Sequence, residues 1–284
     1  MNSGAEQRAM TVMAIALTFG SGVADVASFT RLGGVFTSVM TGNIVLWGLA
    51  AARGSLTLFS HTAVSISAYI VGVAAGARIA HRVKTAAGTG ASLLESHVSW
   101  VLRSELILLA GFTAGWEISA TRPTGWAQFC LLAVLAAAMG MQSSAVRDMG
   151  MSEVSTTFLT GTLTGLVASA VRPGQTTPHR LRKSGVLIGL AAGAGLCGLL
   201  VATAAAAVPA LLLAALVTTV VVAANPARLT PRASRPPQAS SPAPEQAPAS
   251  AQAPASAPEP VIGSQDHGSQ GRGNQDGGNQ DRGS

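Results

Sequence analysis

The chain has little that could build a metal site or a disulfide framework. Only two of its 284 residues are cysteines, Cys130 and Cys197, and they lie in different apolar segments. Thiols placed in this way are most simply small buried hydrophobic side chains. The five histidines lie far apart and show no ligand spacing, so the sequence predicts no metal site and no cofactor.

Motifs for catalysis are lacking as well. The sequence contains no serine nucleophile elbow, no Walker phosphate loop, no dinucleotide-binding glycine pattern and no His-Glu-x-x-His. We therefore expect a protein that is not an enzyme and assign no catalytic residue. The net charge of +6 does not indicate nucleic-acid binding, because the Lys and Arg residues lie in loops between apolar segments, where the positive-inside rule accounts for them.

Long apolar runs fill most of the chain from Met10 to Ala224. A helix needs roughly 20 apolar residues to cross the hydrocarbon core of a bilayer, and runs of about that length recur with short turns between them. The sequence therefore predicts an all-α, polytopic transmembrane bundle of six to eight segments. The candidate segments are Met10–Phe29, Gly33–Ala52, Phe59–Ala80, Trp100–Ala120, Trp126–Val146, Val154–Val171, Gly185–Ala206 and Pro209–Ala224.

Both ends of the chain differ from this region. Residues 1–9 are a short polar segment, and no persuasive small-x-small cleavage site follows the first apolar run, so we expect a retained helix and not a cleaved secretory signal. From Asn225 the sequence is rich in Pro, Ala, Ser, Gly and Gln. Such a segment has too little apolar surface to offset the entropy of ordering, so residues 225–284 are expected to form a disordered tail.

Two parts of the chain are similar to each other. Residues 33–55 read GGVFTSVMTGNIVLWGLAAARGS, and residues 152–174 read SEVSTTFLTGTLTGLVASAVRPG. At an offset of 119, with no gap, Thr41-Gly42 aligns with Thr160-Gly161 and Gly76 aligns with Gly195. We therefore predict an internal repeat, with its halves at about 10–120 and 126–224.

Two topologies fit this repeat. If all eight segments cross, the halves are parallel, and the loops hold ten Arg and Lys on the inner side against five outside. If the two Thr-Gly segments enter and return on the same side, six spans remain, the halves are inverted, and the count is twelve against three. The positive-inside rule favours the second topology, with both termini cytoplasmic, but Gly33–Ala52 is long enough to cross. The sequence leaves both topologies open.

Small residues recur at four-residue spacing in several segments. In lipid, small residues allow helix backbones to approach closely, so we expect these faces to be buried against other helices. Membrane lipid is the expected environment, and a homo-oligomer is compatible with the sequence. The glycines concerned are Gly72 and Gly76, Gly111 and Gly115, Gly161 and Gly165, and the series Gly185, Gly189 and Gly193.

Polar residues within the apolar segments are the candidates for function. A charge at the bilayer centre costs about 2.5–3.5 kcal/mol on insertion scales, so Asp25 either faces water or a partner where Gly20 and Gly22 break the helix, or is an interfacial cap. The Thr-Gly segments present broken backbone to a solute or ion, or their hydroxyls bond only to their own helices. The candidate pathway residues are Asp25, Thr41, Gly42, Asn43, Gln142, Thr160, Gly161 and Thr162.

Gln142 lies deep in its segment, and we expect it to form a hydrogen bond across the interface between the halves. Arg103 and Glu105 lie near the start of their segment, where long side chains reach out to the headgroups. Glu117 lies twelve residues beyond Glu105, about 18 Å along a helix, so these two carboxylates are not expected to act as a pair.

The segment GSGVADVASFTRLGGVFTSVMTGNIVLWGLA, with the later GMQSSAVR and STTFLTGTLTGL, resembles the YoaK family of bacterial inner-membrane proteins. The resemblance covers essentially 10–224 and implies a multi-pass protein of the bacterial inner membrane. That family is classed as a domain of unknown function, so it implies no substrate. Ser143 departs from the family pattern, in which Asn is common, and this weakens any role for an amide there. The motif positions that the resemblance implies are Asp25, Phe36, Thr41, Gly42, Asn43, Gln142, Arg147, Thr157, Thr160, Gly161 and Thr162.

These features together favour a transporter or channel-like protein for an unknown small solute. Its site would lie where the two Thr-Gly segments meet, with Asp25 as a counter-ion or proton acceptor. Because Asp25 aligns with Ser144, the charged site would be single. Two other classes stay open: a structural or regulatory membrane protein that recruits a partner through its tail, and an intramembrane enzyme that acts on lipid.

Overall fold

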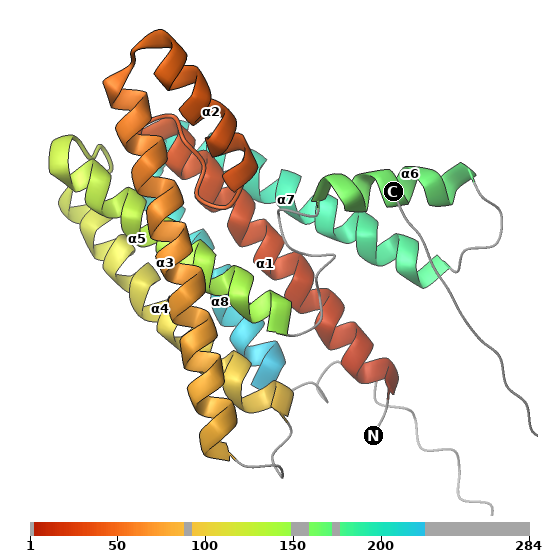
Figure 1. The fold of residues 1–284 in the computed structure, drawn as a ribbon. Coiled ribbons are helices and arrows are strands. Elements are labelled where there is room, and N and C mark those ends of the chain that lie inside the picture. Colours follow the sequence, from red (N-terminus) through yellow and green to blue (C-terminus); the bar gives the residue numbers. More distant parts are fainter. Residues whose placement is uncertain (1–2, 88–92, 149–158, 172–176, 225–284) are drawn as a thin grey trace, which may run out of the picture. The chain divides into compact units, whose positions relative to one another are not determined.

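The computed structural model describes residues 3–87, 93–148, 159–171 and 177–224, and these form helices with short connections between them (Figure 1). The expected disordered tail, residues 1–2 of the N-terminal segment and Thr157 lie outside the described residues. Helix α1 already begins at Ser3, within the segment 1–9 that was expected to precede the first helix. The helices are α1 Ser3–Arg31, α2 Met40–Arg53, α3 Leu56–Ala87, α4 Leu93–Ile118, α5 Gly125–Asp148, α6 Leu159–Val171, α7 Thr177–Thr203, the 3-10 turn η4 Ala205–Ala207, and α8 Val208–Ala224.

Length divides these helices into two groups. The described residues include five stretches long and apolar enough to cross a membrane: Gln7–Arg31, Leu56–Val83, Gly125–Arg147, Arg182–Thr203 and Ala205–Ala223. Helix α4 has 26 residues and is also long enough, but it carries three charged side chains in its apolar part. Helices α2 and α6 have 14 and 13 residues. At 1.5 Å per residue each is about 20 Å long, which is shorter than a hydrocarbon core of about 30 Å.

Side-chain hydrogen bonds place several helix ends together. The Gln128 amide at the start of α5 donates to the carbonyl oxygen of Arg31, the last residue of α1, over 2.9 Å. The ring Nε2 of His61, in the second turn of α3, lies 3.1 Å from Oε1 of Gln128. Helix α1 therefore ends where α3 and α5 begin. We call this end of the bundle the Arg31 end, and the opposite end the Arg8 end.

Two more bonds add the remaining long helices to the Arg31 end. The Arg31 guanidinium donates to the carbonyl oxygen of Val201, near the end of α7, over 3.0 Å. The Trp116 indole, near the end of α4, donates to Ala205 in η4 just before α8, also over 3.0 Å. Helices α1, α4 and α7 therefore run toward the Arg31 end, and α3, α5 and α8 run away from it.

These directions settle how the first Thr-Gly segment runs within the bundle. Since α1 ends and α3 begins at the same end, the chain between them goes into the bundle and returns. It enters as the non-helical residues 32–39 and returns as α2, which lies beside α3 (Figure 1). Gly54 closes the turn from α2 to α3 with a left-handed backbone, φ +65°. Of the two topologies that the sequence left open, the structure has the one in which Gly33–Ala52 does not cross, because the first third of this segment is not helical and its helix is too short.

The most extensive helix–helix contacts are between two pairs of parallel helices, α1 with α7 and α3 with α5. In the first pair a side chain on Gly22 would overlap the backbone carbonyl of Leu190 and crowd the amide of Ala194. A side chain on Gly193 would overlap the carbonyl of Phe19. Glycine is required at both positions because the two backbones touch, as small residues permit in lipid.

The pair α3 and α5 crosses in the same manner. A side chain on Gly140 would overlap the carbonyl of Tyr69 and crowd the amide of Val73, and one on Gly72 would overlap the carbonyl of Ala137. Each of the two pairs therefore crosses at a glycine from both helices, Gly22 and Gly193 in the first pair and Gly72 and Gly140 in the second.

Not every glycine in the small-residue series makes such a contact. A side chain on Gly111 or Gly161 would meet nothing within 4 Å, so the expected burial of those two positions is wrong. Gly115 on α4 meets only the side chain of Leu131, whereas the glycines that touch the backbone of another helix lie on the helices of the two parallel pairs. Close approach is therefore concentrated in these crossings and is not a general property of the glycine-rich segments.

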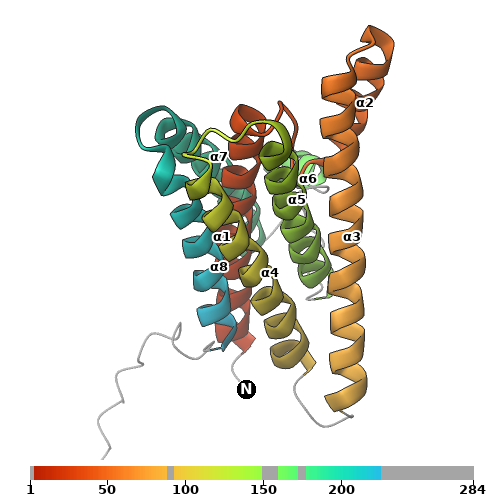
Figure 2. The same cartoon turned by 90° about the vertical axis from the view of Figure 1, so that its left-hand side faces the viewer.

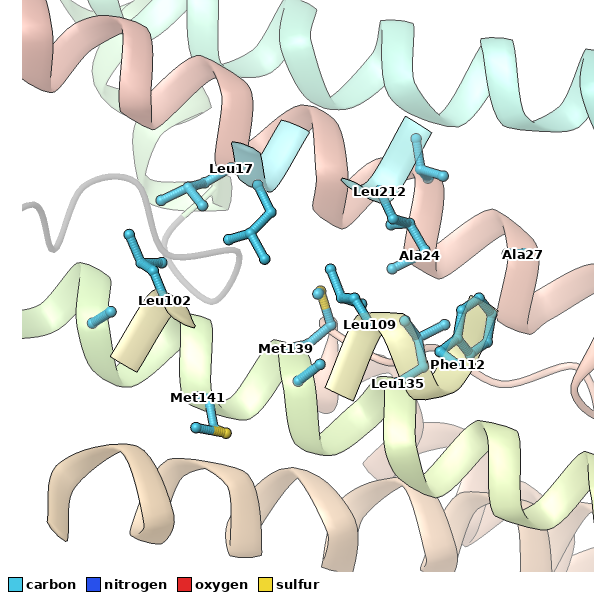
Figure 3. Close-up of a cluster of buried hydrophobic side chains, with 14 of the residues drawn as sticks. Leu17, Ala24, Ala27, Leu102, Leu109, Phe112, Leu135, Met139, Met141 and Leu212 are labelled. Atoms are coloured by element: carbon cyan, nitrogen blue, oxygen red, sulfur yellow. The ribbon is translucent and has the colours of Figure 1, made fainter. Parts of the chain in front are cut away.

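The helices divide into two groups that meet across a buried apolar core. Helix α1 packs on α7 and α8, while α5 packs on α3 and α4. The groups touch where α1 meets α5 and where α4 meets α8, which lie side by side in both views (Figures 1 and 2). Four helices contribute to the core between the groups, through Leu17, Leu109, Met139 and Leu212 (Figure 3).

Replacing Gly72 or Gly193 by alanine is expected to lower the thermal denaturation midpoint in detergent. Overpacking of this kind typically costs about 1–3 kcal/mol, and the atoms in the way belong to backbone that cannot rotate aside. Gly111→Ala is the control, because its site is open. Equal midpoints for Gly72→Ala and Gly111→Ala would contradict the crossing described here.

Helix direction predicts which loops share a side of the membrane. In a variant without Cys130 and Cys197, single cysteines at Arg53 and Arg122 are expected to react with an impermeant thiol reagent from the same side. A cysteine at Arg8, near the start of α1, is expected to react from the opposite side, because α1 crosses and α2 does not. All three side chains are exposed. Labelling of positions 8 and 53 from one side would show that α2 crosses.

Candidate functional site

Asp25 binds the non-helical residues 32–39 that follow α1, which we call the returning segment. This carboxylate is 7% exposed and lies six residues before the end of α1, so the returning segment reaches about 9 Å back along the helix. Its Oδ1 accepts the backbone N–H groups of Thr37 and Ser38 over 2.9 and 2.8 Å. Its Oδ2 accepts the Ser38 hydroxyl over 2.5 Å, and the Thr37 hydroxyl lies 3.4 Å from Oδ1.

Asn43 fixes the same segment from the side of α2. Its Oδ1 accepts the backbone N–H of Phe36 over 2.9 Å, and its Nδ2 donates to the Phe36 carbonyl over 2.6 Å. The Ser65 hydroxyl on α3 donates to that same carbonyl over 2.6 Å, and Ser28 on α1 donates to the carbonyl of Val35 over 2.8 Å. Together with Asp25, these side chains form what we call the segment clamp: Asp25, Ser28, Asn43 and Ser65.

The segment clamp supplies hydrogen-bond partners to backbone groups that are not helical and lie away from water. The flanking helices bond only the Leu32 N–H and the carbonyls of Ser38 and Val39. The groups between them have no helix partner, and unsatisfied groups cost several kcal/mol each in lipid. The clamp supplies partners from α1, α2 and α3. The expected break of α1 at Gly20 and Gly22 is wrong, because α1 is continuous through Asp25 to Arg31. The Asp25 carboxyl instead binds the backbone N–H groups of Thr37 and Ser38, just before the start of α2.

The Thr-Gly pair of this segment lies beside the clamp. Thr41 is exposed, and Gly42 is half-buried against the ring of Phe36. That ring stacks on Phe29 with 5.3 Å between centroids. Of the four predicted residues in the first half, Asp25 and Asn43 therefore converge on one segment, whereas Thr41 faces outward.

The second Thr-Gly segment is arranged differently. Thr160 and Gly161 are exposed at the start of α6, and Thr162 is 5% exposed. The Thr164 hydroxyl bonds back to the carbonyl of Thr160 over 2.9 Å, as hydroxyls commonly do within helices. Helix α6 packs on α7, while α2 packs on α3. The packing in the described part of the chain thus does not bring the two Thr-Gly segments into one site.

Gln142 bonds between α5 and α1, as expected. Its Nε2 donates to the carbonyl oxygen of Leu17 over 3.1 Å, and its side chain is 5% exposed. Beside it lies a cavity of about 10 Å³ where α1, α4, α5 and α8 meet. That volume is close to the smallest that holds one water molecule. The cavity is lined by Leu17, Gly20, Glu105, Leu109, Met139, Gln142, Leu212, Ala215 and Leu216.

Glu105 overturns an expectation, because its side chain does not reach the headgroups. It is 1% exposed, and its Oε2 has no hydrogen-bond partner among the described residues. Arg103 does remain exposed, with its guanidinium 5.6 Å from the centre of the Trp100 ring. The sequence carried a signal for this burial, since the buried positions of α4 recur at helical spacing and include Glu105. They are Val101, Leu102, Glu105, Leu109, Phe112 and Trp116.

The fold and its apolar helices define a multi-pass helical membrane protein. Residues 13–224 match the family described as protein of unknown function (DUF1275), and the chain belongs to this family. It is also 30% identical over 151 residues to the UPF0700 transmembrane protein YoaK of Bacillus subtilis (strain 168). That match covers 53% of this chain and 63% of the relative, so the chain spans less than two thirds of the relative's length. No solved structure matches.

Asp25→Ala is expected to destabilise the returning segment. The substitution leaves the N–H groups of Thr37 and Ser38 without an acceptor, at about 1–3 kcal/mol each. Hydrogen exchange of peptides covering residues 33–43 should become faster and the thermal midpoint should fall. Thr30→Ala is the matched control, since that exposed hydroxyl bonds only within α1. Unchanged exchange in Asp25→Ala would show that the segment does not depend on the clamp.

Proposed function

We propose that the protein is a transporter or channel-like protein that moves a small solute through the helical bundle. The main support is the order of helix directions. The three long helices α1, α3 and α4 run to, from and to the Arg31 end, whereas α5, α7 and α8 run from, to and from it. Two similar halves of opposite direction, each with a short helix after its first long helix, are a layout that membrane transporters use.

The same pattern supports the internal repeat. Helix contacts keep their pairing when the halves are exchanged, since α1 with α7 becomes α5 with α3, and α1 with α8 becomes α5 with α4. The equivalent glycine crossings repeat this correspondence at the level of single residues. We infer that one ancestral unit was duplicated and that the second copy has the inverted orientation.

Two of the hydrogen bonds between the two helix groups suggest how such a protein would open, while a third, from Gln142 to Leu17, lies deeper in the bundle. Gln128 bonds to Arg31 and Trp116 bonds to Ala205, and both bonds lie at the Arg31 end. In this arrangement the groups are held together at that end. We propose that solute moves when the α1–α7–α8 group tilts against the α3–α4–α5 group, which would release these bonds and open the Arg31 end.

We place the Arg8 end in the cytoplasm. In the described part of the chain, that end carries Arg8, Arg78, Arg82, Arg147, Arg182 and Lys183, while the other carries Arg31, Arg53 and Arg122. The positive-inside rule then gives a bacterial inner-membrane protein with cytoplasmic termini. Lipid and a small solute are its proposed partners, and neither a nucleic acid nor an enzymatic step is part of the proposal.

In this proposal the polar role of Asp25 is to position the returning segment. Its carboxylate is already filled by donors of the chain itself, so direct contact with a solute would require these bonds to open. Thr41 and the half-buried Gly42 lie next to the segment and are the residues that a passing solute would meet. The exposed Thr160 and Gly161 on α6 would serve in the same way in the other half.

A flux measurement on the purified chain tests the proposal. Small solutes that raise the thermal midpoint are selected first, and their flux is then measured in liposomes that contain the protein. We expect saturable flux, its loss in Asp25→Ala, which leaves the N–H groups of Thr37 and Ser38 without their acceptor, and its retention in Thr30→Ala and after deletion of residues 226–284. Asp25→Asn keeps an oxygen acceptor for the two N–H groups, so it should stay folded and retain flux. Activity in cells that needs the tail, without flux in liposomes, would favour a recruiting protein instead.

A further inference from the structure

Glu105 and its cavity are not used by the returning segment and have a chemistry of their own. The cavity lies beside Leu17 and Gly20, close to the middle of the span Gln7–Arg31. It also lies between the two helix groups, with α1 and α8 on one side and α4 and α5 on the other. We propose that Glu105 is a proton-binding site, which holds one proton while the bundle is closed around it.

The surroundings of Glu105 decide against a permanent charge. An ionised carboxylate taken out of water loses several kcal/mol of solvation unless an opposite charge or donors replace it. The Oε2 of Glu105 has no donor among the described residues, in contrast to Asp25 with its four. When the carboxylate takes up a proton it becomes a neutral acid, and this penalty disappears.

Among the described residues, the elements around the cavity offer no competing charge. The lining from α1, α5 and α8 is Leu, Gly, Met, Ala and the neutral amide of Gln142. Helix α3 also packs on α4, but it lines no part of the cavity, and its Tyr69 hydroxyl donates to Ser143 over 2.8 Å. Arg103 is turned away toward Trp100, and Glu117 is exposed near the end of α4. The proton is therefore held by Glu105 alone.

The size and lining of the cavity favour a proton over a metal cation. Hard cations take several oxygen ligands, about six or more for calcium and magnesium. Here Glu105 and Gln142 are the polar side chains in the lining, and the volume of about 10 Å³ is near that of one water molecule. A neutral acid needs only one acceptor, which the Gln142 amide or a single water can supply.

The position of the site gives the proton a use. Because the carboxyl is 1% exposed, proton exchange with bulk water requires the helix groups to separate. Deprotonation in the open state and protonation before closure would then tie each opening to one proton. This use as a coupling proton rests on the proposed transport function, whereas the proton site itself does not.

Infrared difference spectroscopy of the full chain in lipid tests the site directly. A protonated carboxylic acid has a carbonyl band that a carboxylate lacks. At neutral pH we expect this band in the difference between the wild-type protein and Glu105→Gln, which keeps the shape of the side chain. The control difference, between wild type and Glu117→Gln, should lack it, because Glu117 is exposed on the same helix. No band in the first difference would overturn the proposal.

A second measurement separates the proton from a metal cation. Thermal midpoints of the wild-type protein and Glu105→Gln are compared in sodium, potassium and choline chloride at equal ionic strength. We expect the three salts to give the same midpoint for each protein. Stabilisation by sodium or potassium that Glu105→Gln abolishes would overturn the proton assignment in favour of a cation site. Neither readout uses flux, so a failure of the transport proposal would leave both results interpretable.

Discussion

The structure depends on the rule that backbone polar groups away from water must find partners within the protein. Helices obey this rule by themselves, but residues 32–39 do not, and their groups are satisfied from outside. Asp25, Ser28, Asn43 and Ser65 supply those partners from three different helices. Without them the first Thr-Gly segment would have to continue as a helix, and the direction of every later helix would change.

Two buried carboxyl groups have opposite surroundings within this bundle. Asp25 accepts hydrogen bonds from four donors, and these bonds hold a broken segment in place. Glu105 is also buried, but it lies beside a largely apolar cavity, and its Oε2 has no donor among the described residues. Both are buried acids within long helices, and their roles follow from their surroundings and not from their residue type. An intramembrane carboxylate therefore has to be interpreted from its donors before it is assigned to a pathway.

Much of the fold was evident in the sequence. The apolar runs predict the long helices, and the excess of Arg and Lys favours the topology in which α2 returns. The residues Asp25, Asn43 and Gln142 were also found, because each is polar within an apolar run. The sequence could not show which residues form the hydrogen-bond partners of these side chains. Nothing local to Asp25 shows that its partners are Thr37 and Ser38, since that pairing exists only once the chain has turned back.

The errors have physical reasons as well. Glu105 was expected near the headgroups because it lies close to the first apolar residues of its segment, but α4 begins earlier, at Leu93, and this moves Glu105 inward. The two Thr-Gly segments are the most similar parts of the sequence, but the sequence alone does not show which glycines meet the backbone of another helix, as Gly22 and Gly140 do.

The pairing of α1 with α7 and of α5 with α3 also has a consequence for biosynthesis. When the ribosome has completed α1 to α4, the helix on which α1 packs most extensively has not yet been made. The two glycine faces of α1 and α7 meet only after most of the chain has entered the membrane. Neither sequence half is therefore a folding unit, and α1 has to remain in lipid with an unfilled glycine face until the second half arrives. The packing of the first helix is therefore completed only after the last helices have entered the membrane.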